Sequence, residues 1–245
     1  MFQKLRKSKK LLLVAMACAT FAIAGCGSDT TKNAADNGNA VTWSETFDGT
    51  KTDFAVKSSP THAVSMSQAT TEMMLQLGLE DKMAGTAFKE EEIYPPLQAA
   101  YDKVKVLSDK WPSYEVFMSV KPDFATGWPD SFSKRAIPAD KMIAQKVNIW
   151  LPESMLSTKA DLETNFNDMI KLGEIFGVKS KAEEWVAGQR KTLAAIQDKL
   201  KDLPRKRVFI YDSEDGQPFT AFEGYTTNIL KLIGADNVMS GLGVD

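Results

Sequence analysis

The chain has 245 residues, of which 43% are apolar, and it carries 30 Lys and Arg against 32 Asp and Glu. The excess of acidic side chains argues against nucleic acid as a partner and against charge-driven binding to an anionic lipid surface. The length suffices for one large domain or for two smaller lobes, each with its own apolar core.

Residues 1–25 have the pattern of a secretory signal peptide. Five basic residues within residues 4–10 precede an apolar run, Leu11–Ile23, which is shorter than the about 20 residues that span a bilayer. Without those five charges, 25 basic against 32 acidic side chains leave a net charge of −7. The junction Ile23-Ala24-Gly25-Cys26 resembles the lipobox of bacterial lipoproteins, which implies cleavage before Cys26 and lipid on its thiol. The alternative is an ordinary signal peptide with an incidental cysteine.

The use of cysteine agrees with export. The chain has 2 Cys: Cys18 would leave with the signal peptide and Cys26 would carry the lipid, so we expect no disulfide. Residues 26–58 are expected to form a flexible tether, because residues 29–40 are rich in Asn, Asp, Ala and Thr. Since two or more acyl chains anchor a protein stably, we expect a lipid-anchored protein on the extracytoplasmic face of the cell membrane, in a leaflet that the sequence leaves open.

Residues 59–160 predict an N-terminal α/β lobe. Strand-like segments alternate with short helical ones from Pro60 onward, and such alternation indicates βαβ units and a parallel sheet. The expected strands cover residues 62–67, 82–87, 103–107, 123–128 and 147–152, and the expected helices cover residues 68–77, 95–101, 114–120 and 138–145.

Residues 161–203 predict two longer helices. An N-cap within residues 158–161 opens a helix that ends at Gly177, and a capping box at Ser180 opens a second one that reaches Leu200. The second helix would be roughly 31 Å long at 1.5 Å per residue, which suits a helix that bridges two lobes.

Residues 204–245 predict a partial C-terminal α/β lobe. One strand is expected over residues 205–212 and one amphipathic helix over residues 225–234. One strand cannot form a stable sheet, so we expect this lobe to be incomplete in the chain. The alternative is a small helical appendage packed on the first sheet.

Four segments in order resemble the substrate-binding proteins of iron-siderophore and vitamin B12 importers: residues 60–87, 113–128, 171–200 and 225–238. The resemblance implies a two-lobed periplasmic-binding-protein fold with a long helix between the lobes, a small hinge motion, and ligand held in the cleft. It also implies docking onto an ABC permease that a cytoplasmic ATPase powers. We expect a monomer.

The candidate ligand-binding residues follow the strands, because clefts in open α/β lobes lie at the carboxyl ends of strands. They are Ser67, Gln68, Phe88, Trp111, Trp128, Arg135, Phe222 and Tyr225. Aromatic rings suit a large, flat or chelated ligand. Arg135, with Lys134, could pair with an anionic ferric chelate, although the sequence favours a solvated surface pair. Trp150 and Trp185 fit element faces and are expected to be structural.

The resemblance also implies two acidic residues that pair with permease arginines. Glu115 occupies that position in the first lobe, and Asp236 is the candidate in the second. For Glu115, the alternative is an ordinary glutamate at a helix N-terminus, where the helix dipole favours it.

The chain is poorly supplied for catalysis. It has 1 His, no Gly-x-Ser-x-Gly segment and no phosphate-binding glycine loop, so we expect no enzyme, no cofactor and no resident metal site. The function expected is the binding component of an importer for a ferric siderophore or related metal chelate. A corrinoid such as vitamin B12, or haem, is the alternative ligand, and a surface scaffold lipoprotein without transport function is the alternative class.

Overall fold

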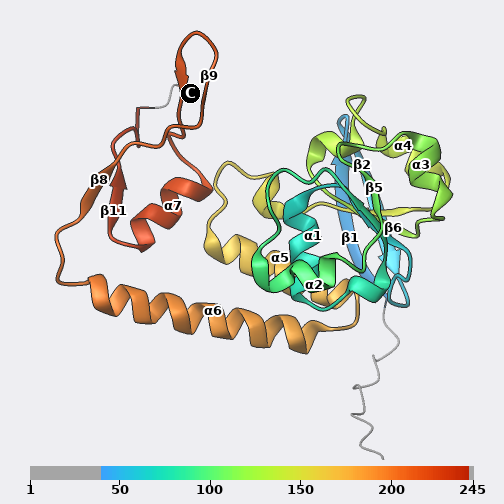
Figure 1. Ribbon diagram of the computed structural model, residues 1–245, viewed down its shortest axis with the longest axis horizontal. Coiled ribbons are helices and arrows are strands. Elements are labelled where there is room, and N and C mark those ends of the chain that lie inside the picture. Colours follow the sequence, from blue (N-terminus) through green and yellow to red (C-terminus); the bar gives the residue numbers. More distant parts are fainter. Residues whose placement is uncertain (1–39, 243–245) are drawn as a thin grey trace, which may run out of the picture. The chain divides into compact units, whose positions relative to one another are not determined.

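The computed structural model describes residues 40–242, which belong to one compact unit, Asp36–Asp245 (Figure 1). The predicted signal peptide, the lipidation site Cys26 and the first part of the predicted tether lie outside the described residues. Among the described helices, none combines the length and the apolar character needed to cross a membrane.

A five-stranded parallel sheet organises the first part of the chain, as the alternating pattern predicts. Its strand order is β5-β4-β3-β6-β7, with β3 at Ala63–Ser65, β4 at Met83–Ala87, β5 at Val106–Ser108, β6 at Phe124–Thr126 and β7 at Asn148–Trp150. The chain runs outward from β3 to β5, then returns to place β6 on the other side of β3. This reversal is a topological switch point, the place where open α/β sheets form ligand crevices.

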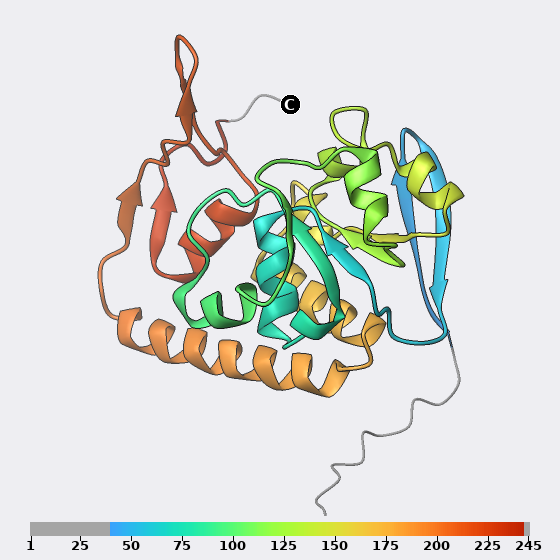
Figure 2. The ribbon, with the colours of Figure 1, turned by 45° about the vertical axis from the view of Figure 1, so that its right-hand side comes forward.

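Helices cover both faces of this sheet (Figure 2). One face packs against α1 (Gln68–Gln76), α5 (Leu162–Ile175) and the start of α6 (Lys179–Leu200), and the other packs against α3 (Tyr114–Ser119) and α4 (Ala139–Ala144). The shorter helical segments are η1 (Glu80–Lys82), η2 (Pro95–Leu97), α2 (Gln98–Tyr101), η3 (Pro129–Phe132) and η4 (Glu153–Met155). Because both faces are covered, neighbouring residues of a strand are buried in different cores.

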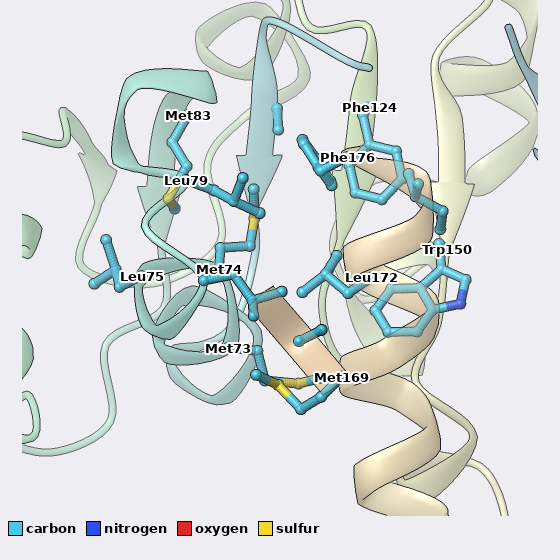
Figure 3. Packing of buried hydrophobic residues seen from close by; sticks show 14 of the residues in the cluster. Met73, Met74, Leu75, Leu79, Met83, Phe124, Trp150, Met169, Leu172 and Phe176 are labelled. Carbon is cyan, nitrogen blue, oxygen red and sulfur yellow. The ribbon is translucent and has the colours of Figure 1, made fainter. Parts of the chain in front are cut away.

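The core on the α1 and α5 side is rich in methionine and aromatic side chains (Figure 3). Phe124 of β6 meets Phe176 edge to face, with 5.1 Å between ring centroids. Met74 and Leu172 are fully buried beside them. Each such side chain contributes about 1.5–3 kcal/mol by leaving water, so this core is a main source of the stability of the fold. Trp150 is buried in the same cluster, as the sequence predicts.

A β-hairpin occupies much of the segment that the sequence predicts to be a tether. Its strands are β1 (Val41–Phe47) and β2 (Thr50–Val56), joined by Asp48 and Gly49, which have φ of 48° and 77°. Trp43 stacks on Phe54 at 5.7 Å and donates a hydrogen bond from Nε1 to the carbonyl of Ile149 in β7 at 2.7 Å. The expectation of a tether over residues 26–58 is therefore wrong for residues 41–56.

The hairpin also places a buried carboxylate against the chain that leaves β7. Glu45 is 6% exposed and accepts a hydrogen bond from the backbone N–H of Leu151 at 3.0 Å. Burial raises the pKa of Glu45 from its ordinary 4.5 to about 7, with the neighbouring carboxylates of Glu153 and Asp168 acting in the same direction. Asp168 in α5 accepts from the backbone N–H groups of Glu153 and Ser154 at 2.8 and 2.9 Å. Two buried carboxylates therefore hold the chain that follows β7.

The two long helices pack closely where α5 ends and α6 begins. Asp161 caps α5 and forms a capping box with Thr164, within the expected region. A Cβ added to Gly173 would lie 2.7 Å from the Cβ of Ala182, so the small residue permits the contact. The capping box expected at Ser180 is wrong, because α6 already begins at Lys179 and no side chain caps it.

The long helix α6 makes contacts at its two ends. Near its start Ala182 and Val186 are buried against the first lobe, whereas most of its later residues are exposed. Near its end, Gln197 donates from Nε2 to the carbonyl of Leu232, which closes the C-terminal helix α7 (Tyr225–Leu232). The helix thus connects the first lobe to the C-terminal segment, as expected of a bridging helix.

The C-terminal segment has two small sheets of its own. Strand β8 (Lys206–Val208) pairs in parallel with β11 (Ala235–Asn237), and β9 (Ser213–Glu214) pairs with β10 (Pro218–Phe219). The strand expected over residues 205–212 is shorter than predicted, and the sequence interpretation missed β11. Because β8 and β11 pair with each other and not with the five-stranded sheet, the segment is a partial α/β lobe and not a helical appendage of the first sheet.

Candidate functional site

The loops that follow β4, β5 and β6 meet at the carboxyl end of the sheet and border an open hollow of about 460 Å³. We call it the strand-end pocket, and its lining consists of Phe88, Glu90, Trp111, Trp128, Pro129 and Asp130. It lies beside the switch point between β3 and β6, where the loops diverge to opposite sides. The structure thus brings together three of the predicted ligand-binding residues, Phe88, Trp111 and Trp128.

Phe88 and Trp111 form one aromatic wall of the pocket. Their rings stack with centroids 4.6 Å apart and an angle of 16° between planes. Phe88 has φ of 59°, a conformation that is uncommon and costly for a residue with a Cβ. Trp111 is fixed from the other side, since its Nε1 donates to the carbonyl of Met66 at 3.2 Å. Both rings are half-buried, which leaves part of the aromatic surface open to a ligand.

Trp128 faces this wall from the loop after β6 and is tied to the loop after β4. Its Nε1 donates to Oε2 of Glu90 at 3.3 Å. The loop that carries Glu90 is held by Gln68, whose Oε1 accepts from the N–H groups of Glu90 and Glu91 at 2.9 and 2.7 Å. Gln68, a predicted ligand-binding residue, therefore positions the pocket loop instead of lining the pocket.

Asp130 and Arg135 supply the other charges near the pocket. Arg135 donates from its guanidinium to Oδ2 of Asp130, and both side chains are exposed. The helical turn η3 that carries Asp130 is anchored by Ser131, whose hydroxyl donates to the carbonyl of Met66 at 3.2 Å. The guanidinium of Arg135 is thus engaged with Asp130 and is not part of the pocket lining.

Ser67 does not reach the pocket. It is the N-cap of α1, accepting from the N–H of Thr70 at 3.2 Å, and its side chain is fully buried among the hydroxyls of Ser65 and Thr70. The expectation that Ser67 contacts ligand is not supported, because its hydroxyl is already used as a helix cap.

Phe222 and Tyr225, the predicted contributions of the second lobe, do not line the strand-end pocket either. Phe222 is 36% exposed. Tyr225 begins α7 and is half-buried, and burial, followed by the nearby Asp168 carboxylate, raises the pKa of its phenol. Their role in ligand binding stays a prediction.

A second hollow of about 720 Å³ lies along the flanks of helices. We call it the helix-flank pocket; its lining includes Met73, Tyr94, Met155, Met169 and Trp185. It is larger than the strand-end pocket, but most of its lining lies on the sides of α1, α5 and α6, and not at the carboxyl ends of strands, where ligand sites of such sheets form. Trp185 also packs edge to face on Phe166 at 6.2 Å, in keeping with its predicted structural role. The strand-end pocket is therefore the candidate site.

The two predicted docking acids differ in their surroundings. Glu115 lies exposed in the first turn of α3, and hydrogen bonds from its own backbone N–H and from the capping Ser113 lower its pKa. Asp236 forms an exposed bidentate pair with Arg205, with distances of 2.7–2.9 Å. Among residues 40–242 no arginine forms an ion pair with Glu115, whereas a permease arginine would have to displace Arg205 from Asp236.

The two carboxylates of the strand-end pocket, Glu90 and Asp130, were not predicted from the sequence. Glu90 lies two residues after Phe88, and Asp130 lies two residues after Trp128. Both aromatic residues were predicted as ligand-binding because they follow strands. The signal was therefore present, since a loop that leaves a strand contributes more than its first residue to a crevice. Within residues 40–242, no three His, Cys, Asp or Glu side chains are grouped to hold a metal ion.

The fold and the pocket agree with the comparison of the chain with known protein families. A family model described as periplasmic binding protein matches residues 64–243. The chain belongs to this family.

The chain is also similar to individual periplasmic and substrate-binding proteins. The crystal structure of a periplasmic binding protein from Veillonella parvula is similar at 95% sequence identity with a TM-score of 0.83, over 85% of this chain and 70% of that one. The ABC transporter substrate-binding lipoprotein YvrC of Bacillus subtilis, itself uncharacterised, is 26% identical over 94% of this chain and 73% of its own length. A vitamin B12-binding protein of Vibrio vulnificus is 24% identical over 73% of this chain but only 61% of its own length.

Proposed function

We propose that this protein is the extracytoplasmic substrate-binding component of an ABC importer, and that it captures a metal chelate or corrinoid and delivers it to a membrane permease. The observation that carries the proposal is the strand-end pocket, with Phe88, Trp111 and Trp128 in its lining. Membership of the periplasmic binding protein family supports it. The proposed role is binding without catalysis.

The chemistry of the pocket suits ligands with broad, weakly polar faces. Aromatic side chains supply large contact areas at little cost in conformational entropy, and they stack on flat ligands. Ferric siderophores and corrinoids present such faces around a chelated metal. At about 460 Å³, the pocket takes in part of such a ligand, and we propose that the C-terminal lobe, through Phe222 and Tyr225, covers the rest.

We further propose that lipid on Cys26 anchors the protein to the membrane and that Glu115 is the docking acid of the first lobe. The lipobox-like junction supports the anchor, and the exposed position of Glu115 supports the docking role. Replacing Cys26 with Ser is expected to move the protein from the membrane fraction to the soluble fraction. Unchanged membrane association of that variant would contradict the anchor.

The ligand test uses the full mature protein with Cys26 replaced by Ser, titrated by calorimetry with ferrioxamine B, a ferric catecholate, cobalamin and haemin. We expect saturable binding of at least one of these at micromolar concentration or below. Trp111→Ala and Trp128→Ala are each expected to weaken that binding at least about tenfold, the loss typical of an aromatic anchor. Tyr94→Ala, in the helix-flank pocket, is the matched control and is expected to leave it unchanged.

Two outcomes would contradict the proposal. Absence of binding to all four compounds would favour a surface scaffold lipoprotein. Binding that depends on Tyr94 and not on the two tryptophans would move the site to the helix-flank pocket.

A further inference from the structure

The strand-end pocket contains charge of only one sign in its lining. Among its six lining residues the ionisable ones are Glu90 and Asp130, both acidic, and the others are aromatic rings and a proline. A ligand that stacks on the aromatic wall therefore meets the carboxylate of Glu90 and the carboxylate of Asp130, of which Asp130 is paired with Arg135.

Arg135 offsets the charge of Asp130, with which it is paired, and it does not line the pocket. The charge that a ligand meets in the lining is therefore mainly that of Glu90. Lys89, Lys110 and Lys134 are neighbours in sequence, but they are exposed and are also outside the lining.

The position of Glu90 is fixed by the fold. Gln68 holds the backbone N–H of Glu90 at 2.9 Å, and Trp128 donates to one of its carboxylate oxygens at 3.3 Å. Glu90 is exposed, and it shares the pocket lining with the rings of Phe88 and Trp111. A charge held in place beside a partly desolvated surface acts on a ligand more strongly than a mobile surface charge does.

We infer that the strand-end pocket selects metal complexes that are neutral or cationic over complexes that are anionic. This inference rests on the proposed function and narrows its substrate class. It favours ferric hydroxamates and corrinoids, and it disfavours ferric catecholates, which are polyanions, and haem, which carries propionate groups. Arg135, which the sequence offered as a partner of an anionic ferric chelate or as an exposed surface residue, is exposed and pairs with Asp130.

The test compares ligands of one shape and different charge. One series is ferrioxamine B with its free ammonium group, its N-acetyl derivative and its N-succinyl derivative; the other is aquacobalamin, cyanocobalamin and a carboxylic acid derivative of cyanocobalamin. We expect affinity to fall from cation to neutral complex to anion, by about tenfold across the series that binds.

Variants separate the local charge from the net charge of the protein. Glu90→Gln keeps an acceptor for Trp128 and removes the charge, so the affinity difference between cation and anion is expected to shrink severalfold. Glu91→Gln is the matched control: it removes the same charge from the same exposed loop but lies outside the lining, and it is expected to leave the difference unchanged.

The outcomes distinguish this inference from the proposed function. Tightest binding of the anionic member, equal binding of all three members, or equal effects of Glu90→Gln and Glu91→Gln would overturn the charge selection while leaving the binding role in place. Binding of a ferric catecholate or haemin alone would do the same. Absence of binding to both series, to a ferric catecholate and to haemin would overturn the proposed function and the inference with it.

Discussion

Replacing Glu45 with Gln is predicted to stabilise the protein at alkaline pH and to have no effect in mild acid. The carboxylate of Glu45 is buried and accepts the N–H of Leu151 at 3.0 Å. Burial raises its pKa from 4.5 to about 7, so the folded protein holds this proton more tightly than the unfolded chain does. Glutamine is close in shape, keeps an oxygen for Leu151 and cannot ionise.

The size of the effect follows from linkage between proton binding and folding. The raised pKa of Glu45 contributes to stability in full below pH 4.5, and this contribution is lost as the pH rises through about 7. One pKa unit corresponds to about 1.4 kcal/mol, so the ionised side chain lowers the free energy of unfolding by about 3 kcal/mol. For a chain of this length, each kcal/mol shifts Tm by about 2–4 °C.

The assay is the difference in Tm and in urea midpoint between Glu45→Gln and the wild type, measured from pH 4.5 to pH 8 (values set by the pKa of Glu45). We expect no difference at the acid end and a variant that is more stable by about 3 kcal/mol at the alkaline end. Glu184→Gln, on the exposed face of α6, is the control and is expected to show little difference at any pH. A difference for Glu45→Gln that does not change with pH would refute the reasoning.

Four other substitutions test packing, docking and the pocket. Gly173→Ala is expected to lower the free energy of unfolding by about 1–3 kcal/mol, because the added Cβ would lie 2.7 Å from the Cβ of Ala182. Gly188→Ala is the control: its Cβ meets nothing within 4 Å, and it is expected to raise the free energy of unfolding by up to about 1 kcal/mol. Equal urea midpoints for the two variants would contradict the packing of α5 on α6. Glu115→Lys is expected to abolish ligand uptake by cells without changing ligand affinity, and a loss of affinity instead would contradict a docking role. Phe88→Ala is expected to weaken ligand binding about tenfold through loss of the stacked wall, and unchanged affinity by calorimetry would exclude it from the site.

The sheet could be predicted because its signal is local. Each strand of the first lobe is a short apolar run bounded by turn residues, and its helix partner follows within a few residues. The carboxyl ends of parallel strands meet at one edge, so the same reasoning brought Phe88, Trp111 and Trp128 together without knowledge of their contacts.

The failures have physical causes as well. The hairpin was missed although Asp48-Gly49 between two strand-like segments is a local hairpin signal, because the tether was expected to continue from the polar residues 29–40 to residue 58. Its stability also depends on the contact of Trp43 with Ile149 in a distant strand. Ser67 was misassigned because a serine after a strand serves equally as a ligand contact or as a helix cap, and the cap was used. The placement of Glu90 depends on Gln68 holding its loop, which no local pattern indicates.

The central claim is that ligand binds in the strand-end pocket, and the side chains of the 5 Trp residues test it directly. The indole N–H groups are resolved by NMR in ¹⁵N-labelled protein, and each can be assigned by substitution with Phe. Upon titration with the tightest-binding complex of the series above, we predict large shifts for Trp111 and Trp128 and small ones for Trp43 and Trp150, which lie in the hairpin contact and the core. Shifts confined to Trp185, in the helix-flank pocket, would contradict the claim.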